Sequence, residues 1–273
     1  MSEIKLGSEF YMKQTEGERT LVKVLWTGGY DSTYRIVELS RHDVVVQPYY
    51  LSDKHRHSEK FELDAISEIT ADIEKHPETR CKLLPLIKRQ VSDLKPDNEI
   101  LQAYERLRNI SYLGPQYIWL AEFAKSNNGL ELCIEMLDCQ SGATYCIRRE
   151  GELKKINEGG LVYWILNEEK SSRDIFTVFG SMHFPIIELS KVDMLEGYKQ
   201  MGLYETMKKT WFCHTPVRGE PCGVCNPCKH VIKEGLSFRI PPAGMERHKI
   251  EIHYNNEGWF KYWKKIRYRI YGY

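Results

Sequence analysis

The chain has 273 residues, which is enough for one large hydrophobic core or for two unequal lobes. Its 39 Lys and Arg residues nearly balance its 38 Asp and Glu residues, so no overall field favours nucleic acid, which we do not expect as a partner. No apolar run reaches the ~20 residues of a membrane span, and the N-terminal segment lacks the apolar core of a signal peptide. We therefore expect a cytoplasmic protein with no membrane partner, in which clustered cysteines among the eight serve as metal ligands rather than as disulfides.

The stretch from Leu21 to Thr33 organises the chain. A short apolar run that ends at Trp26 predicts a buried strand, two glycines stop it, and a helical pattern begins after them. Gly28 and Gly29 let the backbone turn tightly and approach a ligand at a point where a Cβ would intrude. The free N–H groups of the helix start, with a dipole that contributes ~0.3–1 kcal/mol, favour an anion there. The hydroxyls that follow add further donors.

The loop over residues 27–32 reads T-G-G-Y-D-S and lacks the spacing and the lysine of a Walker loop. It resembles the S-G-G-x-D-S PP-loop of ATP pyrophosphatases, a family that grips the β- and γ-phosphates and cleaves ATP between the α- and β-phosphates. An ordinary strand–turn–helix with a Gly-Gly turn is the alternative. The resemblance implies that Asp31 and Ser32 act in catalysis. It also implies an ATP site formed by Leu25, Trp26, Thr27, Gly28, Gly29, Asp31, Ser32 and Thr33.

The elements that follow predict an α/β fold. A second buried strand over 44–50 ends near Asp53, where the polar residues 54–57 either face the same crevice as the glycine loop or form a solvated loop. The resulting β-α-β-α-β-α-α-β order predicts a doubly wound parallel sheet of the PP-loop adenine-nucleotide type over residues 21–205. Residues 1–20 are expected to form an N-terminal arm. The remaining patterns predict a helix over 61–73, a short strand over 81–87, helices over 98–108 and 117–125, and a buried strand over 130–137.

The next segment has a looser pattern. Residues 138–170 are broken by glycines and predict an inserted loop or lid beyond a strand end. Residues 175–187 have the apolar character of a further strand. Ser190 and Asp193 then have the spacing of a capping box, with Asp in place of Glu or Gln, and predict a helix that ends at Gly202.

A cysteine cluster lies in a Gly- and Pro-rich stretch with little core of its own. Four thiolates can close a tetrahedral Zn²⁺ site, and such sites contribute ~10–16 kcal/mol to folding. An iron–sulfur cluster, two disulfides or free thiols are the alternatives. Because four thiolates satisfy zinc, we expect the neighbouring His214 and His230 not to be ligands. The spacing predicts a zinc-binding subdomain over residues 206–240, with the ligands Cys213, Cys222, Cys225 and Cys228.

This cluster, with Trp211 before it, resembles the zinc motif of the QueC family, the 7-cyano-7-deazaguanine synthases. The PP-loop, Arg108-Asn109 before a helix, and Pro185 followed by S-K-V-D at 190–193 match the same family in order, so the resemblance covers roughly residues 20–236. It implies a carbon–nitrogen ligase that adenylates 7-carboxy-7-deazaguanine with ATP and Mg²⁺, releases pyrophosphate and passes the acyl group to ammonia. A second ATP then dehydrates the amide to the nitrile of the queuosine pathway.

The same resemblance suggests roles for two cations. Lys191 would neutralise the α-phosphate in the transition state, and its alternative is a surface charge in a first helical turn, where the dipole disfavours a cation. Arg108 would face nucleotide or substrate, although an arginine at a helix end is often solvated. Asp53 would lie at the nucleotide crevice if the cluster after the second strand faces it.

Three features depart from the family: about 20 extra residues before the first strand, a different pattern after Leu137, and a longer tail after Gly235. Paralogues of the family in antiviral defence gene clusters are thought to join the deazaguanine acyl group to another acceptor. The departures favour such a paralogue slightly, with a protein or other macromolecular amine as the acceptor.

Residues 241–273 predict a basic aromatic tail helix, because Trp259, Trp263, Ile266 and Ile270 recur on one face. We expect this face to pack on its own domain or in a homodimer; a protein partner and nucleic acid are the alternatives. Two rival functions stay open. A PP-loop tRNA-modifying thiolase would need a reactive cysteine near the loop, and a non-catalytic zinc and nucleic-acid binding module would not need the loop at all.

Overall fold

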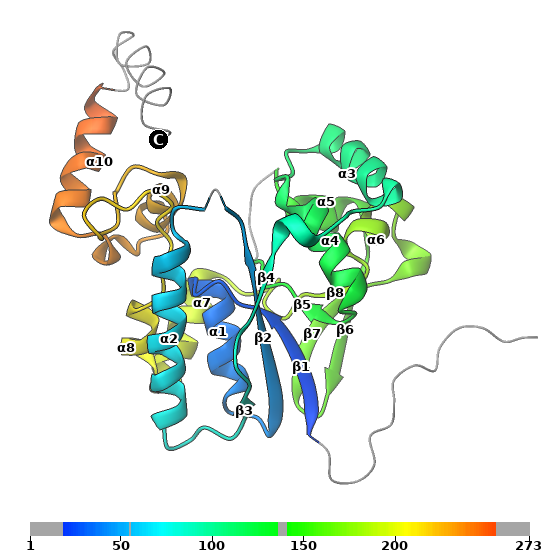
Figure 1. Ribbon diagram of the computed structural model, residues 1–273, viewed down its shortest axis with the longest axis horizontal. Coiled ribbons are helices and arrows are strands. Elements are labelled where there is room, and N and C mark those ends of the chain that lie inside the picture. The colour runs from blue at the N-terminus through cyan, green and yellow to red at the C-terminus, as the bar shows by residue number, and fades with distance from the viewer. Residues whose placement is uncertain (1–18, 55, 136–140, 255–273) are drawn as a thin grey trace, which may run out of the picture.

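The computed structural model describes residues 19–54, 56–135 and 141–254. Its centre is a parallel sheet of six strands in the order β3-β2-β1-β5-β8, with β4 also paired to β2 (Figure 1). The chain runs outward from β1 to one edge and then returns to build the other side from β5. This is a doubly wound sheet, as the sequence predicted. The strands are β1 (Thr20–Leu25), β2 (Val44–Ser52), β3 (Lys82–Leu83), β4 (Ile87–Gln90), β5 (Leu130–Glu131) and β8 (Met182–His183).

Helices cover both faces of the sheet, and each face has its own apolar core (Figure 1). One core is built with α1 (Tyr30–Leu39), α2 (Glu59–Lys75), α7 (Lys191–Gln200) and α8 (Tyr204–Lys208). The other is built with α3 (Asn98–Ile110), α4 (Gln116–Ser126), α5 (Ala143–Glu150) and α6 (Arg173–Phe179). The described residues also contain three 3₁₀ turns: η1 (Val91–Asp93), η2 (Glu168–Lys170) and η3 (Ser237–Arg239). Within the described residues, no helix combines the length and the apolar character that crossing a membrane requires.

The strand order reverses between β1 and β5, and a buried ion pair fixes the two sides of this reversal. Arg35 on α1 is 1% exposed and Glu131 on β5 is 2% exposed. The Nε and Nη2 atoms of Arg35 lie 2.8 and 2.6 Å from the two carboxylate oxygens of Glu131. Such a two-bond pair holds both side chains in one geometry. The start of α1 and the end of β5 are therefore held in fixed positions around the crevice that ligands occupy in open α/β sheets.

Two sequence predictions need correction. Residues 175–187 do not form one strand, because α6 occupies the first part and only Met182 and His183 pair in the sheet. The Ser172 hydroxyl caps α6 by accepting a hydrogen bond from the Ile175 N–H at 3.4 Å. A buried seven-residue helix has the same short apolar run as a strand, so the pattern alone did not separate them. In the described part of the strand predicted over 130–137, which ends at residue 135, only Leu130 and Glu131 pair in the sheet.

The region predicted as an irregular lid is largely regular. It contains α5 and an antiparallel hairpin of β6 (Leu153–Glu158) and β7 (Leu161–Leu166). Gly159 and Gly160 have positive φ angles and form the hairpin turn, as expected for glycines at such positions. An isolated bridge between Trp164 and Phe184 connects the hairpin to the chain that follows β8. The glycines that suggested a loose segment therefore lie at the ends of helices and strands: Gly142 and Gly151 flank α5, and Gly159 and Gly160 lie between β6 and β7.

The cysteine-rich segment packs against the core on the α1 side of the sheet. It contains α9 (Asn226–Lys233) and leads into α10 (Pro242–Tyr254), which starts where the tail helix was predicted. Cys213, Cys222 and Cys228 are buried in the same cluster as β1 and α1. The predicted domain boundary at residue 205 falls inside α8. The aromatic stripe predicted from Trp259 onward lies outside the described residues.

Candidate nucleotide site and metal centre

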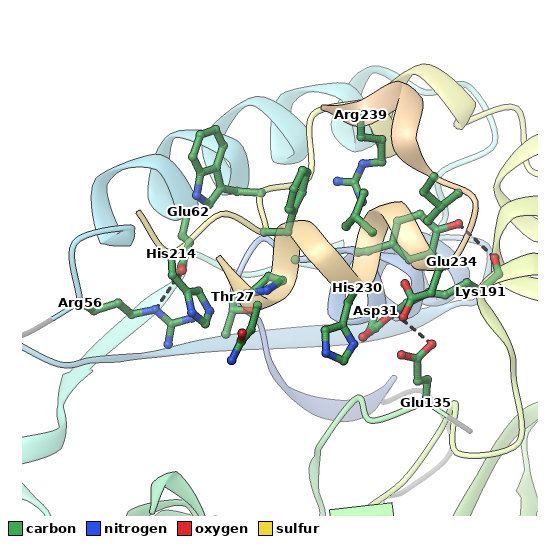
Figure 2. Close-up of a pocket in the computed structure, with 18 residues that line it drawn as sticks. Thr27, Asp31, Arg56, Glu62, Glu135, Lys191, His214, His230, Glu234 and Arg239 are labelled. Atoms are coloured by element: carbon green, nitrogen blue, oxygen red, sulfur yellow. Dashed lines mark hydrogen bonds and ion pairs between the residues drawn. The ribbon is translucent and has the colours of Figure 1, made fainter. Parts of the chain in front are cut away.

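A cavity of about 410 Å³ opens at the carboxyl ends of β1 and β5, where the strand order reverses. Ligands in doubly wound sheets bind at this position because the loops after the two strands diverge there. Figure 2 shows acidic, basic and imidazole side chains converging on it from the sheet, from α7 and from the cysteine-rich segment. Its ionisable side chains are Tyr30, Asp31, Arg56, Glu62, Glu135, Lys191, His214, His230, Glu234 and Arg239.

The glycine loop forms one wall of the cavity through Thr27 and Gly29. Gly28 has a φ of +67°, and a Cβ at this position would come within 2.7 Å of the Glu62 carbonyl oxygen. Only glycine avoids both the strain and the collision. Gly29 is the N-cap residue of α1, and no side chain caps this helix. The first N–H groups of α1 therefore stay available to an anion at the cavity.

Four residues in or beside the glycine loop that were expected at the ATP site have buried side chains. Trp26 is fully buried, and its indole N–H donates to the Thr33 hydroxyl at 3.0 Å. Thr33 is also fully buried, so its side chain stabilises the loop from behind rather than facing the cavity. The Ser32 hydroxyl is 6% exposed and accepts a hydrogen bond from the Thr27 N–H at 3.4 Å. Leu25 belongs to the core on the α3–α6 side of the sheet. These side chains set the shape of the loop.

Lys191 lies directly against Asp31, although 160 positions separate them in the chain. Lys191 is the first residue of α7, and Ser190 and Asp193 form the predicted capping box around it. Its Nζ atom is paired with the Asp31 carboxylate and lies 3.1 Å from a carboxylate oxygen of Glu135. Burial opposes the charge on Lys191, but the carboxylates of Asp31 and Glu135 outweigh it and raise its pKa. The lysine is thus a firmly charged cation at the start of α1.

Glu135 follows β5, and at this residue burial outweighs the neighbouring opposite charge. Burial raises its pKa to about 7, although Lys191 opposes the shift. The charged groups that act on it come from three elements: Lys191 on α7, Asp31 on α1 and Glu234 at the end of α9. A carboxyl group with a pKa near neutrality can hold a proton or accept one, as a general base requires.

Replacing Glu135 with Gln is expected to stabilise the protein in a pH-dependent way. A carboxyl group whose pKa is higher in the folded state stabilises that state below its unfolded pKa and loses this contribution as pH rises through the folded pKa. Between pH 4.5 and about 7 the wild type should therefore lose free energy of unfolding relative to Glu135→Gln. The difference should reach about 3 kcal/mol at most. Urea denaturation at pH 5 and pH 8 measures it.

Glu196→Gln is the matched control for that measurement. Glu196 is exposed on α7 and pairs only with Lys199 at the surface, at 3.5 Å. Its substitution should change stability equally at both pH values. An equal change for Glu135→Gln at both pH values would show that this carboxyl group titrates normally and is not desolvated.

The polar cluster after β2 reaches the cavity through Arg56 alone among its described members. The Arg56 guanidinium lies 2.9 Å from the Glu62 carboxylate, beside His214 (Figure 2). Asp53 does not line the cavity, and His55 lies outside the described residues. Arg108 is also absent from the cavity wall: it is half-exposed on α3 and lies 3.9 Å from Glu105. The structure gives neither Asp53 nor Arg108 a place at the nucleotide crevice.

The four cysteines predicted as metal ligands converge on one point. Their Sγ atoms all lie within 4.8 Å of one another, and three of the pairs are 3.4, 3.8 and 3.9 Å apart. A tetrahedral ion with ~2.3 Å bonds to sulfur needs sulfur atoms about 3.8 Å apart, so a single zinc ion fits the cluster. The N–H groups of Cys222, Val224 and Cys225 point at sulfur atoms, as suits thiolates. None of the described cysteines forms a disulfide.

His214 and His230 lie outside the thiol cluster and line the cavity instead. A short stretch of backbone joins the cysteine cluster to a residue that contacts the glycine loop. Trp211, two residues before the first ligand, donates its backbone N–H to the Gly28 carbonyl at 2.8 Å. The cysteine cluster can therefore set the position of the cavity wall that faces the glycine loop.

Sequence reasoning missed several cavity residues, chiefly Tyr30, Glu135, Glu234 and Arg239. Glu135 had a usable signal, because an acidic residue just past a buried parallel strand lies at the ligand-binding edge of the sheet. Arg239 and Glu234 follow the cysteine cluster and had no signal of this kind. Their positions depend on how that segment packs against α1.

No protein-family model matches the sequence, and no curated protein matches it. Among solved structures, the NMN synthetase from Francisella tularensis is similar at 12% sequence identity and a TM-score of 0.35, with 87% of each chain covered. A likeness at this level does not bear on the activity of the chain described here.

Proposed function

We propose that this protein is a PP-loop enzyme that activates a carboxylate with ATP and transfers the acyl group to an amine. The pairing of Lys191 with Asp31 at the start of α1 supports this best. It places a buried cation next to a glycine loop and uncapped helical N–H groups, in a cavity at the reversal of strand order. This arrangement suits a leaving group that carries several negative charges.

Two bond exchanges make up the proposed reaction. A carboxylate oxygen of the substrate attacks the α-phosphorus of ATP, the bond from that phosphorus to the bridging oxygen breaks, and pyrophosphate leaves with the electron pair. Lys191 and the N–H groups of α1 stabilise the negative charge that develops. The amine nitrogen then attacks the acyl carbon, and the carbon–oxygen bond to AMP breaks. The attacking nitrogen is unprotonated, and Glu135 accepts the one proton that this nitrogen loses as the amide forms.

The proposed substrate is 7-carboxy-7-deazaguanine, by resemblance to the QueC family. The loop motif, the capping box that carries Lys191 and the convergent thiols support this resemblance, because all three border one cavity or its wall. The acceptor is an amine, either ammonia or the amine of a macromolecule. We further propose that the four cysteines bind Zn²⁺ and that ATP acts as its magnesium complex.

Nothing among the described residues favours a thiolase. No cysteine lines the described part of the cavity, and Cys139 lies outside the described residues. A binding module without catalysis would not need the partly buried Lys191–Asp31 pair at the glycine loop.

Incubation with MgATP and 7-carboxy-7-deazaguanine tests the proposal. AMP and pyrophosphate should form in equal amounts, and omission of the carboxylate should abolish their formation. ADP and phosphate as the products would refute the PP-loop chemistry. Mass spectrometry of the acylated product then distinguishes the acceptors: a free amide or nitrile identifies ammonia, and a mass increase on a protein or nucleic acid identifies a macromolecular amine.

A further inference from the structure

Arg239 presents a buried cation from the cysteine-rich segment to the start of α1. It ends η3, a short turn that follows α9, the helix that carries Cys228. The guanidinium carbon lies 5.3 Å from the ring centroid of Tyr30 and 4.6 Å from that of Phe212. Two aromatic rings at these distances hold the guanidinium by cation–π attraction. In Figure 2 the side chain reaches from the rim into the space above His230 and Glu234.

Most of the hydrogen-bonding capacity of Arg239 is unused. Its Nη2 atom donates to the Thr210 carbonyl at 2.7 Å and to the Thr210 hydroxyl. The Nε and Nη1 atoms are buried and have no hydrogen-bond partner among the described residues. An arginine has five N–H donors, so three are left without an acceptor. Burial lowers the pKa of Arg239 to about 10, which keeps the group charged at neutral pH.

Leaving such donors unpaired is unfavourable, because a buried cation needs an acceptor or a counter-charge. None of the described carboxylates lies within ion-pair distance of Arg239. The second cavity, of about 370 Å³, shares Arg239, Trp211 and Phe212 with the first. It is also lined by Asp64 and Glu68, neither of which forms an ion pair with Arg239. The described part of the chain thus supplies no acceptor for these donors, and a bound ligand could supply one.

We propose that Arg239 binds an anionic oxygen of the ligand, either on a phosphate of the nucleotide or on the carboxylate of the second substrate. The inference rests on the proposed function, since both anions belong to that reaction. Charge-assisted hydrogen bonds from a guanidinium suit both kinds of oxygen. The Nε and Nη1 atoms are covered in this structure, so binding requires a neighbouring side chain to move. Phe212, whose ring centroid lies 4.6 Å from the guanidinium carbon and which lines both cavities, is the candidate.

Isothermal titration calorimetry of the full-length protein with two separate probes tests whether Arg239 binds an anion. The probes are inorganic pyrophosphate with Mg²⁺ and 7-carboxy-7-deazaguanine without nucleotide. Arg239→Gln should weaken one of the two by about 10- to 100-fold, the scale for losing hydrogen bonds to a charged group, and the affected probe identifies the source of the anion. Arg239→Lys should be intermediate, because it keeps the charge but loses the planar fork.

Arg247→Gln is the matched control. Arg247 belongs to the same segment, but its Nε atom donates to the Cys222 carbonyl at 2.8 Å and its Nη2 atom to the Pro221 carbonyl at 3.3 Å. Arg247→Gln should lower the zinc content or the melting temperature. The folded fraction of this variant should bind pyrophosphate and 7-carboxy-7-deazaguanine as tightly as the wild type does. Arg239→Gln should instead keep the zinc and lose affinity.

Two results would overturn the assignment. One is unchanged affinity of Arg239→Gln for both probes. The other applies if Arg239→Gln does not fold: a folded Arg239→Lys protein that binds both probes with wild-type affinity. Either result can occur while the wild type still releases pyrophosphate from MgATP, so the failure of this inference is distinguishable from failure of the proposed function.

Discussion

Cys225→Ser should yield protein that lacks stoichiometric zinc and whose cysteine-rich segment is unfolded. The segment has three buried thiols in the core shared with β1 and α1, and the fourth, Cys225, completes the tetrahedron. Metal binding contributes ~10–16 kcal/mol in comparable sites, which exceeds the total stability of most domains. An incomplete site loses much of this energy. Elemental analysis measures the zinc content, and circular dichroism and limited proteolysis of the soluble fraction measure the unfolding.

Cys81→Ser provides the control, because Cys81 is a half-buried thiol outside the cluster. It should retain zinc and the wild-type melting temperature. Iron in place of zinc in the wild type would refute the choice of metal. Full zinc occupancy and normal melting of Cys225→Ser would refute the four-thiolate site itself.

Cys225→Ser should also lose cleavage of ATP, although no thiol lines the described part of the cavity. Trp211 hydrogen-bonds to the Gly28 carbonyl, and Arg239 stacks on Tyr30, so the segment forms part of the cavity wall. Unfolding of the segment removes both contacts from the glycine loop. A metal bound by the four thiols would therefore act on the proposed reaction through structure.

Replacing Lys191 with Met should reduce pyrophosphate release from MgATP by about 10²-fold or more, the scale for loss of one preorganised charge-stabilising group. The side chain is 14% exposed and paired with Asp31 and Glu135, so its position is set before any ligand binds. Asp31→Ala should give a loss of similar size, because the lysine then keeps only Glu135 as a partner. Initial rates at saturating ATP measure both effects.

Lys199→Met separates this effect from a general change in charge. Lys199 lies on the same helix, is about half-exposed and pairs only with Glu196. Its substitution should leave the rate unchanged. If Lys191→Met retains wild-type turnover with native circular dichroism, the lysine has no part in phosphoryl transfer and the proposed site is wrong.

Much of the fold was predictable because its signals are local. A helix was predicted to begin near residue 98, with Asp97 or Asn98 as its cap, and the Asp97 carboxylate accepts a hydrogen bond from the Ile100 N–H at 2.8 Å. The capping box of Ser190 and Asp193 formed as predicted. Gly28 adopts the positive φ that its place in the loop indicated. Each of these depends on residues within a few positions of one another, so the tertiary fold had little to change.

The incorrect predictions involved short apolar runs. The pattern over 175–187 fits a strand, yet α6 buries Ile175, Val178 and Phe179 in a helix. A short segment that is buried on most sides has no polar face from which to read a period. Packing against α3, α4 and α5 decided between the two structures.

The sequence by itself therefore determined the parallel α/β architecture, the glycine loop and the four thiols, because each is encoded in a short stretch with its own spacing. Only the tertiary structure decided which side chains meet in the cavity. Lys191 reaches Asp31 across 160 positions, and Glu135 joins them because β5 lies beside β1. Arg239 gains its unpaired donors because the cysteine-rich segment packs onto α1. The energy of these contacts depends on burial and on strand order, and neither is a property of any short stretch of sequence.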